Sequence, residues 1–231
     1  MKLLYTHIDN VPIITLTSEN GKNKLDVNAL RELSALINNA ENDGKSCLVI
    51  TGAGQNFCLG GDLAKSSGNY STVKEFGRIL TDTLLEISRQ EMIIIAAVNG
   101  QTAGGGMSLL EACDLAVATA GATFSIPEVK IGMPPVISYS GTYRMVGRKR
   151  ANEMALFASE LSAKEALLLG IINQIVEDPL KTCIEMAKTI EKNGAFCNKE
   201  IKLLSVRMDN GAMEKQLKSA ADRLNGIVMG V

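Results

Sequence analysis

The sequence has few of the residues on which several classes of protein depend. Its 231 residues include no tryptophan, four tyrosines and five phenylalanines. Because the bases of single-stranded nucleic acids stack on aromatic side chains, this composition offers little for such binding. The net charge of −1 gives the chain no overall attraction for a polyanion or for a membrane surface. We therefore expect neither a nucleic-acid partner nor a membrane partner.

Histidine is also scarce, and the cysteines show no paired spacing. The one histidine, His7, lies in the predicted first strand of an N-terminal hairpin, so a Ser-His-Asp or Cys-His centre is hard to assemble. The five cysteines are odd in number and include no CxxC pair, which favours reduced thiols in a cytoplasmic protein over a disulfide framework. No cluster of ligand residues in the sequence indicates a metal site.

Long apolar runs and a dinucleotide fingerprint are absent as well. No run approaches the length of a membrane span, and His7, Asp9 and Asn10 interrupt the apolar core that a signal peptide needs. The segment GAGQNF (52–57) lacks the third glycine of a dinucleotide-binding loop, so no such cofactor is expected. A chain of this length and ordinary composition is expected to form a single domain.

The sequence does contain a central stretch, residues 93–128, in which an apolar run leads into glycines. Residues 93–98 predict a buried strand, which is followed by a turn at Asn99-Gly100, three glycines at 104–106 and a helix at 107–113. A helix that begins at glycines presents unpaired N–H groups and the positive end of its dipole. Such a helix end can hold developing negative charge.

Residues 47–63 repeat this pattern. A strand-like run, 47–51, is followed by glycines at 52, 54, 60 and 61. Two strand-to-glycine turns can bring two backbone N–H groups to one point, which is the arrangement of an oxyanion hole. Spacing alone does not separate this interpretation from two ordinary turns of an α/β protein, because glycine is common in turns.

Four groups of motifs, in order along the chain, give the sequence a family resemblance. They are GAGQNFCLGGDL (52–63); AVNG (97–100) with AGGG (103–106) and ACD (112–114); FSIPE (124–128) with IG (131–132); and SGT (140–142) with LSAKEA (161–166) and LGII (169–172). On these residues the chain resembles the crotonase superfamily, that is, the enoyl-CoA hydratase/isomerase family. The resemblance extends from about residue 3 to residue 225.

The resemblance implies an α/β fold over residues 1–190, the crotonase (ClpP-like) spiral of repeated β-β-α units. It also implies that residues 191–231 form a helical region that builds a homotrimer or a dimer of trimers. The residue pattern predicts helices over 180–192 and 198–224. Because the chain stops at Val231, we expect a shortened last helix, with a coenzyme site that is covered incompletely or in a different way.

The resemblance assigns catalytic roles to three residues. By position in the family motifs, the backbone N–H groups of Gly61 and Gly105 form the oxyanion hole. Glu128, which follows Pro127 at a predicted strand end, matches a carboxylate that serves as acid and base in many members. A carboxylate moves a proton efficiently when an apolar setting raises its pKa toward the working pH. On residue type alone, Glu128 is instead expected to be a surface charge.

Ser108 departs from the hydratases of the family, which carry a second glutamate at this position. Hydration divides its work between two carboxylates, since one activates the water and the other supplies the proton for the α-carbon. Glu111 lies one helical turn beyond Ser108, either as a surface charge or as a substitute acid. Pro134, in the segment GMPP (132–135), is closer to isomerase-type members than to hydratases. We include Ser108, Glu111 and Pro134 among the predicted substrate-binding residues.

Three lysines are candidates for binding the phosphates of coenzyme A, because lysine pairs readily with phosphate. In the family, the loop that holds Lys22 and Lys24 lies near the nucleotide end of the coenzyme. Lys65 follows the first glycine turn closely. The alternative for each of the three is a solvated position on the surface.

Together these features predict an enzyme that acts on an acyl-CoA thioester and stabilises its enolate. A single glutamate favours an enoyl-CoA isomerase. The alternatives are an enoyl-CoA hydratase, a hydrolase or a decarboxylase of the same superfamily, or a catalytically silent trimer that binds acyl-CoA or a protein. Coenzyme A enters as part of the substrate, and no separate cofactor or metal is expected.

Overall fold

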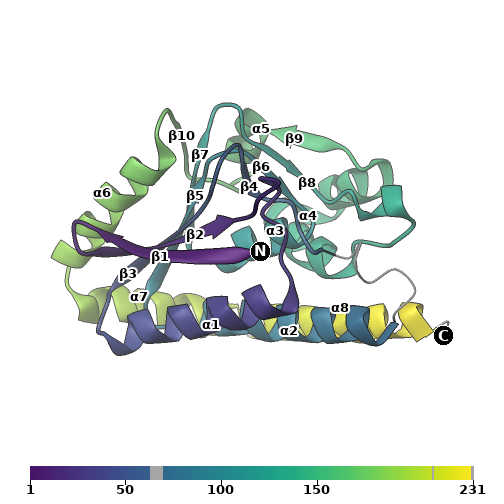
Figure 1. Cartoon of the computed structure of the whole chain (residues 1–231), viewed down its shortest axis with the longest axis horizontal. Helices are drawn as coiled ribbons and strands as arrows, with labels where there is room; N and C mark the ends of the chain where they lie inside the picture. Colours follow the sequence, from purple (N-terminus) through teal and green to yellow (C-terminus); the bar gives the residue numbers. More distant parts are fainter. Residues whose placement is uncertain (63–69, 210, 230–231) are drawn as a thin grey trace.

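Two β-sheets form the framework of the computed structural model, which describes residues 1–62, 70–209 and 211–229 (Figure 1). In the larger sheet β1 (Lys2–Ile8) and β2 (Val11–Thr17) are antiparallel, which confirms the predicted hairpin, whereas every following pair is parallel. The larger sheet has the order β1, β2, β3 (Cys47–Gly52), β5 (Ile93–Val98), β7 (Leu115–Thr119) and β10 (Gln174–Val176). The smaller sheet has the order β4 (Asn56–Cys58), β6 (Gln101–Ala103), β8 (Thr123–Ser125) and β9 (Glu160–Ser162).

Consecutive β-β-α units connect the two sheets. In each unit one strand lies in the larger sheet, the next short strand lies in the smaller sheet, and a helix comes after them. The units are β3-β4-α2, β5-β6-α3 and β7-β8-α4, with α2 at Tyr70–Arg89, α3 at Gly105–Ala112 and α4 at Val136–Phe157; a 3-10 turn, η2 (Glu128–Ile131), lies between β8 and α4. The predicted α/β architecture of repeated β-β-α units is confirmed.

Strand β5 shows why the larger sheet forms at this point of the sequence. All of its side chains are buried, as expected for a central parallel strand that is covered on both faces. Alternate residues belong to different hydrophobic clusters because side chains of a strand point to opposite faces. Ile94 lies in the cluster that includes α1 (Val27–Asn42) and α2, and Ile95 lies in the cluster that includes α6 (Pro179–Lys192).

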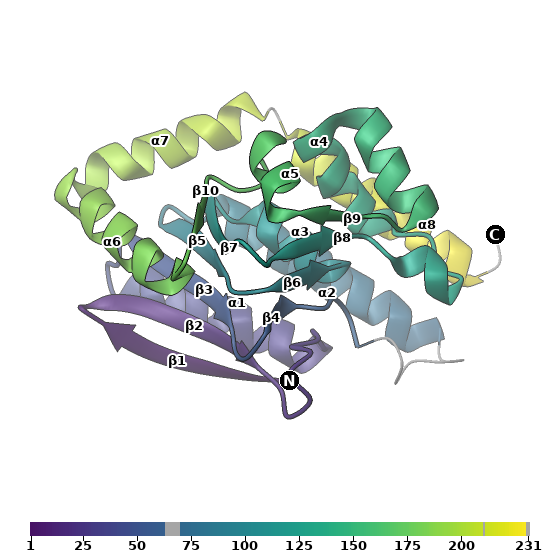
Figure 2. The same ribbon diagram turned by 90° about the horizontal axis from the view of Figure 1, so that it is seen from above.

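Helices cover both faces of this sheet. In Figure 1, α1, α2 and α8 (Ala212–Met229) run side by side along one face, and α2 contacts both of the others. On the other face α6 packs against β3, β5 and β7. Figure 2 shows α6 and α7 (Ala195–Met208) at the end of the molecule opposite the last turns of α8, while the short α5 (Ala163–Leu168) follows β9. None of the described helices is both long and apolar enough to cross a lipid bilayer.

The C-terminal region is helical as predicted, but the prediction of one helix over 198–224 is wrong. Helix α7 ends at Met208, and the carboxylate of Asp209 accepts a hydrogen bond of 2.8 Å from the N–H of Met213, in the first turn of α8. Gly211 has a φ of +67°, which breaks a continuous helix. The predicted boundary at residue 190, between the spiral core and the C-terminal helical region, stays a prediction. Leu217 of α8 belongs to the same hydrophobic cluster as residues of α2.

Candidate active site

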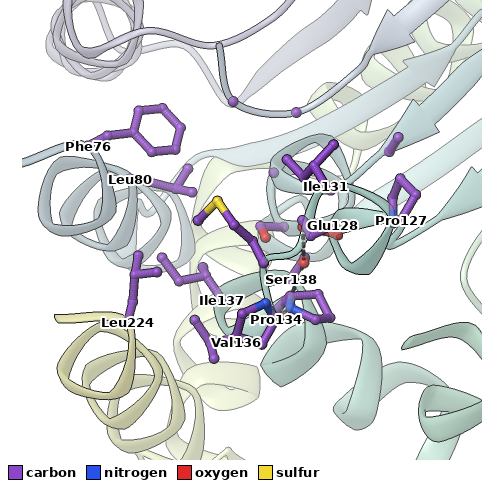
Figure 3. Close-up of a pocket in the computed structure, with 18 of the residues that line it drawn as sticks. Phe76, Leu80, Pro127, Glu128, Ile131, Pro134, Val136, Ile137, Ser138 and Leu224 are labelled. Carbon is purple, nitrogen blue, oxygen red and sulfur yellow. Dashed lines mark hydrogen bonds between the residues drawn. The ribbon is translucent and has the colours of Figure 1, made fainter. Parts of the chain in front are cut away.

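A cavity of about 210 Å³ lies where the two glycine turns meet the start of α4. Helices α2 and α8 form its apolar side, to which α2 contributes Phe76 and Leu80 and α8 contributes Leu224 (Figure 3). Figure 3 also shows Glu128 and Ser138 pointing toward one another beside this apolar wall. Among the described residues that line the cavity, the polar and charged side chains are Lys24, Ser108, Glu128 and Ser138. The cavity therefore combines an apolar wall with a few convergent polar groups.

The two glycine turns are neighbours because β4 and β6 are paired in parallel, which places their carboxyl ends side by side. Gly61 comes after β4, and Gly105 comes after β6. A β-carbon built on Gly105 would lie 3.5 Å from the backbone nitrogen of Gly61. The structure thus brings together the two residues that are predicted to be oxyanion donors.

In the described part of the chain, the local secondary structure uses neither N–H group in a backbone hydrogen bond. Gly105 is the first residue of α3, so its N–H has no partner within the helix. Gly61 forms an isolated parallel bridge with Leu25. That bridge is made by the N–H of Leu25, which donates to the oxygen of Gly60 at 2.7 Å, and by the N–H of Asp62, which donates to the oxygen of Leu25 at 2.8 Å. The N–H of Gly61 takes part in neither bond.

Gly104 and Gly106 each lie where a side chain would not fit between the two glycine turns and their neighbours. Gly104 has a φ of +53°, and a β-carbon there would lie 3.0 Å from Oε1 of Glu128. A β-carbon on Gly106 would lie 2.2 Å from the carbonyl oxygen of Cys58, because α3 packs closely against β4. A side chain at position 106 would therefore separate the two glycine turns.

Glu128 supplies the carboxyl group of the cavity. It begins η2 shortly after β8, and β8 pairs with β6, so Glu128 lies beside the second glycine turn. Its Oε1 accepts a hydrogen bond of 2.5 Å from Oγ of Ser138, whereas its buried Oε2 has no hydrogen-bond partner among the described residues. Burial raises the pKa of Glu128, and the bond from Ser138 opposes part of this rise. This carboxyl group holds a proton more readily than an exposed glutamate and keeps one oxygen free.

Ser108, on α3, offers another unpartnered polar group to the cavity. The residue is 1% exposed, and its Oγ has no hydrogen-bond partner among the described residues. Glu128 is the only carboxylate in the described lining of the cavity. At position 108, where the resemblance leads us to expect a second glutamate in hydratases, this cavity has the hydroxyl group of Ser108. Within the described residues, no three His, Cys, Asp or Glu side chains gather closely enough to hold a metal ion.

Glu111 does not reach this cavity, and the prediction that it is a surface charge is wrong. Its side chain is 4% exposed and lies in a separate polar cavity, where Nη2 of Arg144 is 3.5 Å from its Oε1. The carboxyl group packs on Gly141 of α4, where a β-carbon would lie 2.5 Å from Oε2. Burial raises the pKa of Glu111 to about 7; Arg144 opposes this rise and Asp209 adds to it. Glu111 is therefore not placed to replace a missing acid beside Glu128.

The predicted phosphate-binding lysines have different positions. Lys24 lines the cavity, whereas Lys22 is exposed on the same loop and is not part of the lining. Lys65 lies outside the described residues. Between the first two, Asn23 is fully buried, and its Nδ2 donates a hydrogen bond of 2.8 Å to the carbonyl oxygen of Asn56. This bond ties the loop that carries Lys24 to the chain that forms the first glycine turn.

The sequence does not single out Ser138 or Asn23. Pro134, which is predicted to bind substrate, lines the cavity. Ser138 lies in the first turn of α4, inside the N-cap at Pro135, and no sequence motif marks it. Asn23 has a φ of +48°, which asparagine adopts more readily than most other side chains, and the sequence offers only an asparagine in a polar loop as a signal for it. The helical period marks Leu80 as a core residue, but only the packing of α2 on α8 makes it a wall of the cavity.

Known proteins resemble this chain in sequence and in fold. The family model described as Enoyl-CoA hydratase/isomerase matches residues 7–223. The chain is 31% identical to the short-chain-enoyl-CoA hydratase of Clostridium acetobutylicum, over 91% of this chain and 81% of the relative. It is 29% identical to the crotonyl-CoA hydratase of Syntrophomonas wolfei, over 95% of this chain and 84% of that relative. A crystal structure of an enoyl-CoA hydratase/isomerase from Xanthobacter autotrophicus Py2 has a TM-score of 0.90 and 29% identity, and the match covers 98% of this chain and 87% of that one.

Proposed function

Because the chain belongs to the enoyl-CoA hydratase/isomerase family and has the crotonase fold, we propose that it is a single-glutamate enoyl-CoA isomerase. Glu128 removes a proton from C2 of a 3-enoyl-CoA thioester, and the electron pair of that bond moves toward the thioester oxygen as a dienolate forms. Glu128 then returns the proton to C4, which leaves the double bond between C2 and C3. Coenzyme A stays attached throughout, and the reaction uses no separate cofactor.

The N–H groups of Gly61 and Gly105 stabilise the charge that develops on the thioester oxygen. Support comes from the adjacency of the two backbones and from the freedom of both N–H groups from local hydrogen bonds. Donors that are fixed before the reaction need no reorganisation as the charge forms, and loss of one such donor costs about 3–4 kcal/mol of barrier in other enzymes. An apolar cavity strengthens these interactions because it excludes water.

The observation that carries the proposal is the single carboxylate in the described lining of the cavity. Moving one proton from C2 to C4 needs one group that accepts and then donates it. Adding water needs two tasks at once, since the water must lose a proton while the α-carbon gains one. Glu128, with one oxygen held by Ser138 and the other free, suits the first task.

The second candidate is an enoyl-CoA hydratase, which is favoured by the relatives from Clostridium acetobutylicum and Syntrophomonas wolfei, both of which are named as hydratases. In this case the unpartnered hydroxyl group of Ser108 holds the attacking water opposite Glu128. A hydroxyl group orients water but is a much weaker base than a carboxylate, so we expect hydration to be slow.

The test is turnover of 3-hexenoyl-CoA and of crotonyl-CoA by the wild type and by Glu128→Gln, with the exposed Glu200→Gln as the matched control. We expect fast 3-to-2 isomerisation, slow hydration, a loss of at least a hundredfold for Glu128→Gln and no change for Glu200→Gln. Faster hydration than isomerisation would favour the hydratase. Release of free coenzyme A would favour a hydrolase. Binding without turnover would favour a silent trimer or a decarboxylase, because a decarboxylase needs a substrate with a free carboxyl group and neither probe carries one.

We further propose a homotrimer or a dimer of trimers. Support comes from large apolar side chains on the surface of the described chain, which include Phe157, Leu168 and Phe196 at 78%, 86% and 76% exposure. Sedimentation equilibrium would show a mass three or six times that of the monomer, and a monomeric mass would contradict this assembly. The cytoplasmic location stays a prediction.

A further inference from the structure

Ser138 makes the one side-chain hydrogen bond that the described structure gives to the carboxyl group of Glu128. It lies in the first turn of α4 and is 3% exposed, so bulk solvent has little access to its hydroxyl group. Its Oγ lies 2.5 Å from Oε1 of Glu128 and 3.3 Å from the carbonyl oxygen of Pro135. Two acceptors therefore face a hydroxyl group that has one hydrogen to donate.

The two acceptors match the two protonation states of Glu128. When Glu128 is ionised, the hydroxyl hydrogen goes to Oε1, because a charged acceptor at the shorter distance forms the stronger bond. When Glu128 carries a proton on Oε2, Oε1 is a neutral and weaker acceptor, and the carbonyl oxygen of Pro135 is the alternative acceptor for the same hydrogen. Ser138 thus keeps a partner in both states, which a purely apolar residue cannot do.

We propose that Ser138 is a positioning residue, which holds Oε1 of Glu128 so that Oε2 alone exchanges the proton with the bound thioester. This inference rests on the proposed function. Its geometric basis is that Oε1 is occupied by Ser138 while Oε2 is buried and unpartnered among the described residues. With Oε1 fixed, rotation of the carboxylate is restricted, so Oε2 keeps one position as the proton leaves C2 and arrives at C4.

The other ionisable side chain in the described lining of the cavity is Lys24. Its charge acts on Glu128 equally in the wild type and in variants of Ser138, so a difference between them reports the hydroxyl group. Ser140, two residues further along α4, provides a matched control. Its Oγ donates to the carbonyl oxygen of Ile137 at 2.7 Å, and it does not line this cavity.

The experiment measures kcat, KM and the pH profile of kcat/KM with 3-hexenoyl-CoA for the wild type, Ser138→Ala, Ser138→Cys and Ser140→Ala. A hydroxyl donor favours the ionised carboxylate, so its removal raises the pKa of Glu128 and moves the acidic limb to higher pH. For Ser138→Ala we expect a shift of about one pH unit and a fall in kcat of about tenfold, with KM changed less than about twofold. Ser138→Cys keeps the size but has a weaker donor, so its shift should have the same direction.

An unshifted acidic limb in Ser138→Ala and Ser138→Cys, or a loss that is equal at every pH, would overturn the inference. Thermal melts of all four proteins show whether Ser138→Ala folds; if it does not, Ser138→Cys decides. The Glu128→Gln variant separates the two proposals, since wild-type activity in it would sink the proposed function itself. If no substrate turns over, carbon-13 NMR titration of the Glu128 carboxyl group still tests whether Ser138→Ala raises its pKa.

Discussion

Ser108 occupies a position where one substitution should change the balance between two reactions. Its side chain is buried against the cavity that contains Glu128, and its hydroxyl group has no partner among the described residues. Ser108→Glu restores a second carboxylate, which can take a proton from water while Glu128 supplies one to the α-carbon. We expect the ratio of crotonyl-CoA hydration to 3-hexenoyl-CoA isomerisation to rise about tenfold or more.

The matched control for this change is Ser108→Gln, which has a similar size but no carboxylate. It should lower both rates through crowding and leave their ratio close to that of the wild type. Equal ratios in Ser108→Glu and Ser108→Gln would show that position 108 does not decide between the two reactions.

Glu111 gives a prediction about stability and pH. Burial raises its pKa to about 7 in the folded protein, against about 4.5 in the unfolded chain, so between these values the folded state holds a proton that the unfolded state has lost. The free energy of unfolding therefore falls as the pH rises from about 4.5 to 7 and this contribution is constant above pH 7. Glu111→Gln, which carries no charge, should raise the free energy of unfolding at pH 8 by about 1–3 kcal/mol.

Urea denaturation of the wild type and Glu111→Gln at pH 4.5 and pH 8 measures this effect. The two proteins should differ little at pH 4.5, where Glu111 is protonated in the folded state. A variant less stable than the wild type at pH 8 would mean that the ion pair with Arg144, at 3.5 Å, outweighs the cost of burying the charge.

At the level of elements, the contact between α3 and β4 fixes the distance between the two glycine turns. A β-carbon on Gly106 would lie 2.2 Å from the carbonyl oxygen of Cys58, and a backbone atom cannot rotate away as a side chain can. Gly106→Ala should therefore push α3 from β4, lower the free energy of unfolding by about 1–3 kcal/mol and reduce isomerisation about a hundredfold.

Gly121→Ala is the control, because a β-carbon on Gly121 meets no atom within 4 Å. Both variants are compared with the wild type by urea denaturation and by initial rates. Wild-type activity in Gly106→Ala would contradict the view that close packing of these two elements sets the position of the N–H groups.

Elements with a regular apolar pattern or a capping box could be predicted from the sequence, and a helix boundary that is set by a single cap could not. The alternating burial of β5 follows from its apolar run, and Ser162 and Glu165 form a capping box at the start of α5. The break between α7 and α8 was not predicted, since it depends on the bond from Met213 to Asp209, a local capping that apolar periodicity does not reveal.

On the scale of the whole molecule, the fold explains which residues of the site could be predicted from the sequence. Gly61 and Gly105 are distant in sequence, and the resemblance pairs them because successive β-β-α units place equivalent turns side by side. The contacts between side chains on different elements could not be predicted in this way. Ser138 meets Glu128, and Glu111 meets Arg144, only because α4 crosses both η2 and α3, and no local pattern encodes those crossings.

The central claim is that Glu128 carries one proton from C2 to C4 of a thioester whose oxygen is held by two backbone N–H groups. The most direct measurement is proton NMR of a single reaction mixture that starts from 3-hexenoyl-CoA, with the wild type and with Glu128→Gln. The wild type should convert the substrate to 2-hexenoyl-CoA before any 3-hydroxyacyl product accumulates, and Glu128→Gln should be slower by at least a hundredfold. Isomerisation by Glu128→Gln at the wild-type rate would contradict the claim.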